Sequence, residues 1–197
     1  MNKLLISILM ASFCISCTAQ DIALPAPQRT GGKPLMEALN ERQTTREFSD
    51  RELDEQTLSD LLWAAYGFNR DDKRTAPSAN DHQEFSIYVV LKSGVYVYDA
   101  KQNILVQKVK GDFRAKTGKQ DFVAVAPLNL VYVADTKKSD SGAADVGFIS
   151  QNVYLYCASA GLGTVVRGWF EKEEVKAALQ LSENEVPILT QTVGYKN

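Results

Sequence analysis

The chain has 197 residues, carries a formal net charge of −2 and is 45% hydrophobic, which suits one globular domain with its own core. No basic stripe runs along it, so we do not expect nucleic acid as a partner. Without residues 1–19 the net charge becomes −3, because that segment contains one lysine and no acid.

Residues 1–19 have the pattern of a bacterial export signal. A short positive start that ends at Lys3 precedes the apolar run LLISILMASFCIS, which is shorter than the ~20 apolar residues of a transmembrane helix. Cleavage after Ala19 would leave Gln20 at the new N-terminus. The alternative is lipoprotein processing at Cys17, although Cys14 stands where a leucine is usual. We therefore expect an exported, periplasmic protein that meets the membrane only if Cys17 is lipidated.

Cysteine and histidine are scarce in the rest of the chain. Cys157 is the one cysteine outside the signal segment, so an internal disulfide is not expected, and a buried inert thiol is the simplest interpretation. His82 is the only histidine, which argues against a zinc cluster and against a Ser-His-Asp or Cys-His centre. No pair of acids stands out for carboxylate chemistry.

The first half of the mature chain predicts two helices and a loop. Residues 20–33 are rich in proline, glycine and polar groups and read as an extended lead-in. Pro34 begins a short helix, and Asp54 is a suitable N-cap for a second helix that ends before Gly67. Residues 68–83 have no periodicity, and loops of that length are usually functional or mobile.

The second half predicts a sheet and three helical regions. The expected strands are residues 85–92, 95–100, 104–109, 128–135, 164–169 and 186–195, and the expected helical regions are 111–126, 143–161 and 171–181. This order predicts a single α/β or α+β domain over residues 34–197. The helix at 143–161 is apolar on most sides, so the sheet, other helices or a second subunit must cover it.

The stretch ERQTTREFSD places Arg42 and Arg46 around two threonines at the edge of the first helix. Arginine forks bind phosphate bidentately, and hydroxyl groups and free backbone N–H groups add donors. The stretch therefore suits a phosphate monoester. The alternative is a solvated turn in which the two arginines pair with Glu41 and Glu47.

Two further stretches have the composition of binding loops. In RTAPSANDHQEF, Pro77 stiffens a backbone whose polar side chains match the mixed donor and acceptor edge of a planar heterocycle, although a capped surface loop is the simpler alternative. In AGLGTVVRGW, two glycines permit close backbone approach, and Gly161 also suits a helix C-cap. The pattern is not GxGxxG and follows no strand, so a Rossmann fingerprint is absent.

The order and spacing of these stretches resemble the nitroreductase family of FMN-dependent oxidoreductases over residues 34–195. The matching patterns are R-x-[ST]-x-[RK]-x-F at 42–48, LLWAAYG, APSA-x-x-x-Q at 76–83, and QN-x-x-L followed by GLGT at 151–164. The resemblance implies an α/β/α layered fold with a mixed, mainly antiparallel sheet and helices on both faces. It also implies a homodimer that binds FMN and a small-molecule substrate such as a nitro compound or a quinone.

The resemblance also implies roles for individual residues. The segment that would hold the FMN phosphate and the pyrimidine side of the ring contains Arg42, Gln43, Thr44 and Arg46. The loop at the flavin contains Pro77, Ser78, Ala79, Asn80 and Gln83. Asp81 stands where the family usually has asparagine. The backbone around Arg167 and Gly168 matches the place where an N–H approaches flavin N5, and Lys196 matches a late basic position.

Three alternatives follow from these expectations. The leading hypothesis is an FMN-dependent oxidoreductase in which the flavin performs the redox chemistry. The second is a non-catalytic flavin-binding or electron-carrier protein of the cell envelope, and the third is an exported interaction domain without a cofactor. Export conflicts with NAD(P)H, the usual donor of the family, because NAD(P)H is cytoplasmic. We therefore keep the expectation of export and do not expect NAD(P)H to be the electron donor.

Overall fold

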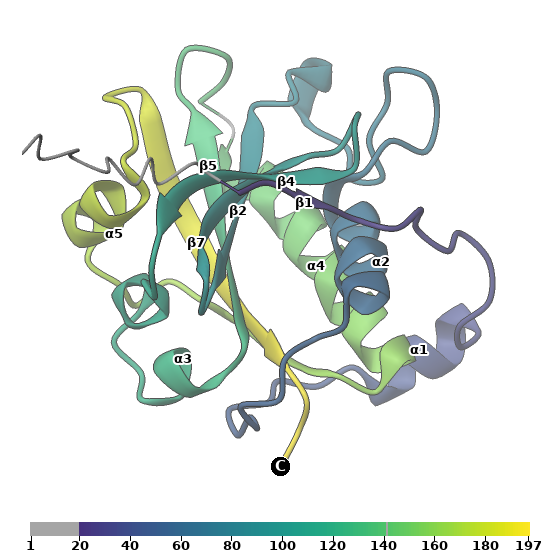
Figure 1. Ribbon diagram of the computed structural model, residues 1–197. Helices are drawn as coiled ribbons and strands as arrows, with labels where there is room; N and C mark the ends of the chain where they lie inside the picture. Colours follow the sequence, from purple (N-terminus) through teal and green to yellow (C-terminus); the bar gives the residue numbers. More distant parts are fainter. Residues whose placement is uncertain (1–19, 141) are drawn as a thin grey trace, which may run out of the picture.

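The computed structural model describes residues 20–140 and 142–197 (Figure 1). The export signal and the Cys17 alternative therefore lie outside the described residues. Within the described residues, no helix has the length and apolar character needed to cross a membrane.

Seven strands form one sheet in the order β1-β4-β3-β2-β5-β7-β6. The strands are β1 (Ile22–Ala23), β2 (Phe85–Leu91), β3 (Gly94–Asp99), β4 (Ile104–Lys110), β5 (Leu128–Asp135), β6 (Gly163–Arg167) and β7 (Glu185–Gly194). All six pairings between them are antiparallel. The mainly antiparallel sheet is confirmed, and these strands show no parallel pairing of the kind that a mixed sheet requires.

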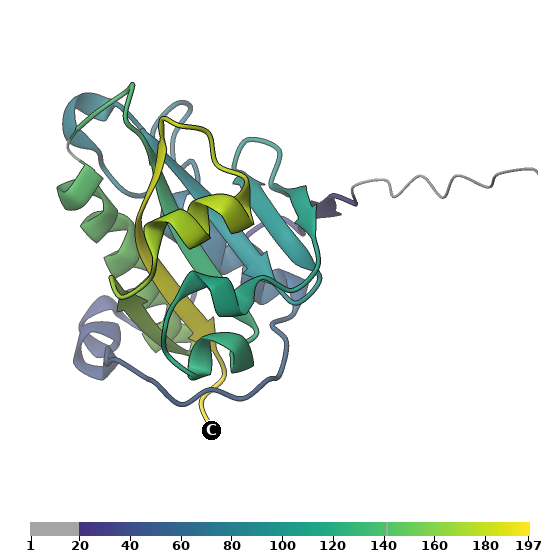
Figure 2. The same cartoon turned by 90° about the vertical axis from the view of Figure 1, so that its left-hand side faces the viewer.

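Helices cover both faces of this sheet, as expected. They are α1 (Leu35–Glu41), α2 (Glu55–Tyr66), the 3-10 turns η1 (Ala79–Asp81) and η2 (Arg114–Thr117), α3 (Phe122–Val125), α4 (Gly142–Ala160) and α5 (Lys172–Leu179). One core lies between the sheet and the helices α2 and α4, and a second lies between the opposite face and α5. Figure 2 shows α5 on the near side of the sheet and α4 beyond it.

The local sequence accounts for the elements that frame the core. The Asp54 side chain accepts a hydrogen bond from Thr57 N at 2.8 Å, which caps α2 as expected. Leu61 and Leu62 are fully buried on the apolar face of that helix. All residues of β5 except its last are buried, because helices cover both of its faces.

Two segments differ from the sequence expectation. Within the lead-in, β1 pairs with β4 at the edge of the sheet, and the Pro- and Gly-rich composition around it hid this short strand. Residues 111–126 form η2 and α3 instead of one helical region. Between them a Cβ on Gly118 would overlap the Arg167 guanidinium, and Thr117 O accepts a hydrogen bond from Arg167 Nη1 at 3.0 Å. The inserted side chain therefore separates the two turns.

Candidate functional site

The segment at residues 42–46 lies along the edge strand β6 and the C-terminal half of α4. Thr45 N donates to Thr164 O at 3.0 Å. The Thr44 hydroxyl lies 3.2 Å from the Tyr154 hydroxyl, which accepts a hydrogen bond from Val166 N at 3.1 Å. The Arg42 guanidinium lies 5.4 Å from the centre of the Tyr154 ring. Tyr154 therefore joins the predicted phosphate segment to β6.

The arginines of this segment have no acidic partner. Glu41 pairs with Lys33 at 2.5 Å, and neither Arg42 nor Arg46 makes an ion pair with any residue that the structure describes. The alternative of a turn neutralised by Glu41 and Glu47 is therefore wrong. Arg46 and Thr44 are exposed, so the segment offers free donors to a ligand.

Lys196 lies beside the same segment. A Cβ on Gly163 would lie 2.9 Å from Thr45 Cγ2 and 3.2 Å from Lys196 Cγ. The absent side chain of Gly163 therefore lets both Thr45 and Lys196 approach the start of β6. Lys196 is exposed, and it adds a third cation to this side of the molecule.

Gly168 directly follows β6 and is exposed. A Cβ at this position would meet only Leu189 Cδ2, at the ordinary contact distance of 3.8 Å, and the backbone is not left-handed. The fold itself therefore has room for a side chain here. A glycine that the protein does not need for its own packing is consistent with close approach of a ligand.

The Arg167 side chain is engaged away from this surface. It is 5% exposed, and Arg167 Nη2 donates to Asn129 Oδ1 at 3.1 Å in addition to its bond to Thr117 O. Burial without a carboxylate partner lowers the pKa of Arg167 to about 10. Only the backbone of Arg167 is left for a cofactor, which agrees with the backbone role that the resemblance implies.

The loop that contains Pro77, Ser78, Ala79, Asn80 and Gln83 lies at the other end of α4, at the top of Figure 1. Ala79 N donates to Asp145 Oδ2 at 2.8 Å, and Gln83 N donates to Ser78 Oγ at 2.9 Å. Asp145 and Tyr154 are nine positions apart in α4, which corresponds to ~14 Å along the helix axis.

The structure therefore brings one group of predicted residues together and leaves a second group apart. Arg42, Gln43, Thr44, Arg46 and the backbone at Gly168 share the edge of the sheet, whereas the loop residues border the N-terminal end of α4. The Gln83 amide is held within its own loop, where it accepts from Arg74 Nε at 3.0 Å and donates to Asp72 O at 2.7 Å.

Sequence reasoning missed the residues that fix these two segments. Tyr154, Asp145 and Glu84 carry no motif that a single sequence reveals. The sequence did contain one indication of the role of Asp145, which is the only charged residue of α4: a charged residue in an apolar helix is expected to have a partner. Its hydrogen-bond partner is the backbone N–H of Ala79 in the loop.

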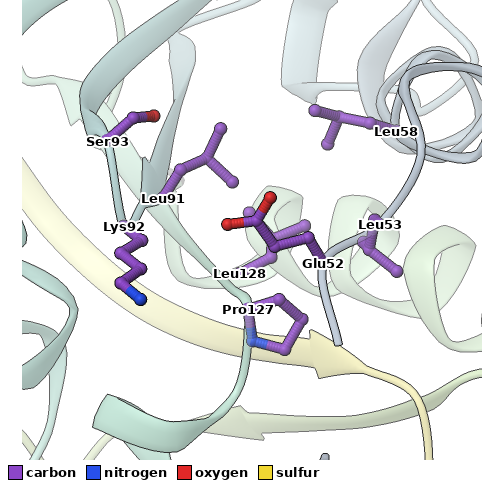
Figure 3. A pocket seen from close by; sticks show the side chains of 8 residues that line it. All are labelled: Glu52, Leu53, Leu58, Leu91, Lys92, Ser93, Pro127 and Leu128. Atoms are coloured by element: carbon purple, nitrogen blue, oxygen red, sulfur yellow. The ribbon is translucent and has the colours of Figure 1, made fainter. Parts of the chain in front are cut away.

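A small, partly open cavity lies elsewhere in the molecule. Side chains of Glu52, Leu58, Lys92 and Pro127 are among those that line it, as Figure 3 shows, and its volume is about 80 Å³. Ligand pockets for organic cofactors occupy ~300–1,000 Å³, so this cavity is too small for a flavin. Within residues 20–140 and 142–197, no group of three acidic, histidine or cysteine side chains has the arrangement of a metal site.

Arginines without acidic partners at an edge strand are suited to bind a phosphate group. A model of the nitroreductase family matches residues 39–195, so the chain belongs to this family of oxidoreductases, which are generally flavin-dependent. A predicted nitroreductase of Methanocaldococcus jannaschii is 33% identical over 183 residues, covering 82% of this chain and 91% of the relative.

Solved structures agree with this assignment. The crystal structure of a predicted nitroreductase from Ralstonia eutropha JMP134 has a TM-score of 0.85 and 44% identity, over 90% of each chain. An FMN-dependent nitroreductase from Clostridium difficile R20291 has a TM-score of 0.62 over 82% of this chain and 87% of its own, with 20% identity. The latter likeness extends to the fold alone.

Proposed function

We propose that this protein is an FMN-dependent oxidoreductase that acts on a small molecule such as a nitro compound or a quinone. The observation that carries the proposal is the pair of arginines without acidic partners, Arg42 and Arg46, with the exposed Thr44 between them, at the same sheet edge as the open backbone at Gly168. A phosphate monoester would neutralise these two cations.

The residues present fit FMN at this edge. Arg42 and Arg46 bind the phosphate through charge-assisted hydrogen bonds, and Lys196 adds positive charge. Tyr154 holds Thr44 in place. Bound flavin supplies hydride or electron transfer. A backbone N–H of the segment at Gly168 would offer a donor to the flavin ring, and the missing side chain leaves room for the ring to approach.

We further propose a homodimer in which α4 packs against its copy. Apart from the buried Asp145, α4 has no charged residue, and its Phe148 is 48% exposed. On the neighbouring α1, Leu35 and Met36 are 63% and 75% exposed. An apolar surface of this kind marks a protein interface.

Two-fold symmetry would also complete the site. In a two-fold pair of α4 helices packed side by side and antiparallel, the N-terminal end of one lies beside the C-terminal end of the other. The Pro77–Ala79 loop of one subunit then reaches the phosphate segment of its partner, although ~14 Å separates the corresponding α4 positions within one chain.

Cofactor release tests the first proposal. The purified mature protein should be yellow, and denaturation should release FMN that chromatography separates from FAD and riboflavin. A protein that stays colourless after reconstitution with FMN would disprove the proposal. Reduction of the bound flavin and its reoxidation by a nitro compound or a quinone separates an enzyme from a non-catalytic flavin carrier.

A mixed dimer tests the shared site. One chain would carry Arg42→Ala with Arg46→Ala, and the other would carry a bulky substitution at Ala79. Each homodimer should bind little flavin, whereas the mixed dimer should recover one intact site out of two. No recovery, or a monomer in light scattering at micromolar concentration, would rule out the shared site.

The export pattern of residues 1–19 underlies our proposal that the protein works in the periplasm. There the electron donor would be something other than NAD(P)H, or the substrate itself would reduce the flavin. The mass of the purified N-terminal peptide distinguishes cleavage before Gln20 from lipidation at Cys17.

A further inference from the structure

The loop between Pro77 and Gln83 has a backbone that needs support from outside. Asn80, Asp81 and Gln83 have φ angles of 50°, 58° and 47°, so three of four consecutive residues are non-glycine residues in the left-handed region. Each such residue costs ~1 kcal/mol or more. The surrounding structure must therefore hold this conformation.

Most of the loop's hydrogen bonds come from the loop itself or from the turn before it. Ser78 and Gln83 bond to each other, Arg74 bonds to Gln83, and Lys73 pairs with Asp81 at 2.6 Å. Asp145 is different, because it reaches Ala79 N from the first turns of α4. Its carboxylate ties the loop to the helical framework, and the helix N-terminus favours its negative charge.

Glu84, which directly follows the loop, is buried next to this tie. It is 2% exposed, and neither of its carboxyl oxygens has a hydrogen-bond partner among the described residues. Burial raises the pKa of Glu84, and the neighbouring Asp145 carboxyl raises it further. A second buried negative charge beside Asp145 would be strongly unfavourable, whereas a neutral Glu84 carboxyl group keeps its proton and can donate a hydrogen bond to the Asp145 carboxylate.

We propose that Glu84 stays protonated as the partner of the Asp145 carboxylate, and that this pair positions the Pro77–Gln83 loop for contact with FMN. The inference rests on the proposed FMN site. Asp145 and Glu84 are positioning residues, because they act on the cofactor through the backbone of the loop. Loss of the proton from Glu84 places two negative charges together and weakens the hold on Ala79.

Other charged and titratable groups surround the pair. They are Tyr66 from α2, Arg74 and His82 from the loop region, and Asp135, Lys137, Lys138 and Glu185 at the cavity that Glu84 also lines. Among these groups, His82 acts electrostatically against the rise in the pKa of Glu84. It needs its own control.

The experiment measures the FMN dissociation constant from pH 5 to 9 by quenching of flavin fluorescence. Wild type, Glu84→Gln, Asp145→Asn, His82→Gln and Asp135→Asn would be compared, since the FMN phosphate titrates near pH 6 in all of them. We expect wild-type affinity to fall by about tenfold toward alkaline pH. Glu84→Gln should keep the acid-side affinity throughout, and Asp145→Asn should also lose the alkaline decrease.

The controls should follow wild type. Persistence of the alkaline decrease in Glu84→Gln would overturn the proposal, and so would its disappearance in His82→Gln. Amide hydrogen exchange in the apoprotein gives a readout without flavin: Asp145→Ala should speed exchange at Ala79 by about tenfold. Unchanged exchange would also overturn the proposal. Failure of wild type to bind FMN at any pH would instead remove the proposed function, and the Ala79 measurement would still test the pair.

Discussion

The polar groups at the two ends of α4 differ in whether they have partners within the protein. At the C-terminal end, Arg42 and Arg46 have no acidic partner and stand open to a ligand. At the N-terminal end, the side chains of Asp145 and Gln83 already accept hydrogen bonds from Ala79 and Arg74, and these bonds hold a strained loop. In the first region the donors remain available to a ligand, whereas in the second region the polar groups fix the conformation of the loop. Substitutions at the first should therefore change affinity, and substitutions at the second should change conformation.

The largest expected effect is at the open end. Arg42→Ala combined with Arg46→Ala removes two charge-assisted phosphate contacts of ~1.5–3 kcal/mol each, so FMN affinity should fall about a hundredfold or more. Neither side chain has an internal ion pair, so the melting temperature of the apoprotein should stay near that of wild type. Isothermal titration and thermal melting measure the two quantities. Wild-type FMN content in the double variant would place the phosphate elsewhere.

Arg167→Ala provides the opposite case in the strand that leads to Gly168. The substitution leaves Thr117 O without its donor and opens a cavity, so the free energy of unfolding should fall by ~2–4 kcal/mol. Urea denaturation measures this, with the exposed Arg46→Ala as the matched arginine control. FMN bound per folded molecule should change little. Unchanged stability would mean that the buried guanidinium network contributes nothing net.

Gly168→Val separates a ligand requirement from a folding requirement. A Cβ meets only Leu189 at 3.8 Å, so thermal stability of the apoprotein should be retained. Flavin affinity or turnover should fall by about tenfold to a hundredfold, because the side chain enters the space that the ring needs. Gly168→Ala should have a smaller effect. Lost stability with intact activity per flavin would show instead that Gly168 serves the turn before Trp169.

The sequence predicted the fold well where local signals agreed with the tertiary structure. The buried run at residues 128–135 and the helix capped by Asp54 formed as expected. β1 was missed because two residues in a proline-rich segment depend entirely on their partner β4. Residues 111–126 were misjudged because Arg167, about 50 positions later, enters between η2 and α3.

The sequence pattern singled out the side chains of the candidate site but not the residues that hold them. Arg42 and Thr44 carry a recognisable donor pattern, and β6 brings them to Gly168. Tyr154 and Asp145 act through contacts with residues distant in the chain, and one sequence does not reveal which loop a buried polar group meets. The sequence also did not reveal that the Arg167 side chain serves the interior, because its partners Thr117 and Asn129 lie far away in the chain.

The smallest expected effect is the pH dependence of the free energy of unfolding that Glu84 causes at the N-terminal end of α4. The pKa of Glu84 is raised above the ordinary 4.5 in the folded protein. The folded state therefore keeps a proton that the unfolded state releases, and stability falls as pH rises above about 4.5 through the raised pKa. Glu84→Gln should lack this decrease, so its stability relative to wild type should grow with pH in that window. Denaturation curves at several pH values measure the difference.

Glu185, which borders the same cavity as Glu84, supplies a control of opposite sign. Burial alone would raise the pKa of Glu185, but hydrogen bonds from Ser182 and Tyr88 hold it below 4.5. That carboxylate stabilises the fold above pH 4.5, and its contribution is lost as pH falls through the lowered pKa. The difference between wild type and Glu185→Gln should therefore shrink toward acid pH, while the difference for Glu84→Gln grows toward alkaline pH. If both differences changed with pH in the same direction, Glu84 would not be protonated, because the pKa values of the two carboxyl groups would then be shifted in the same direction.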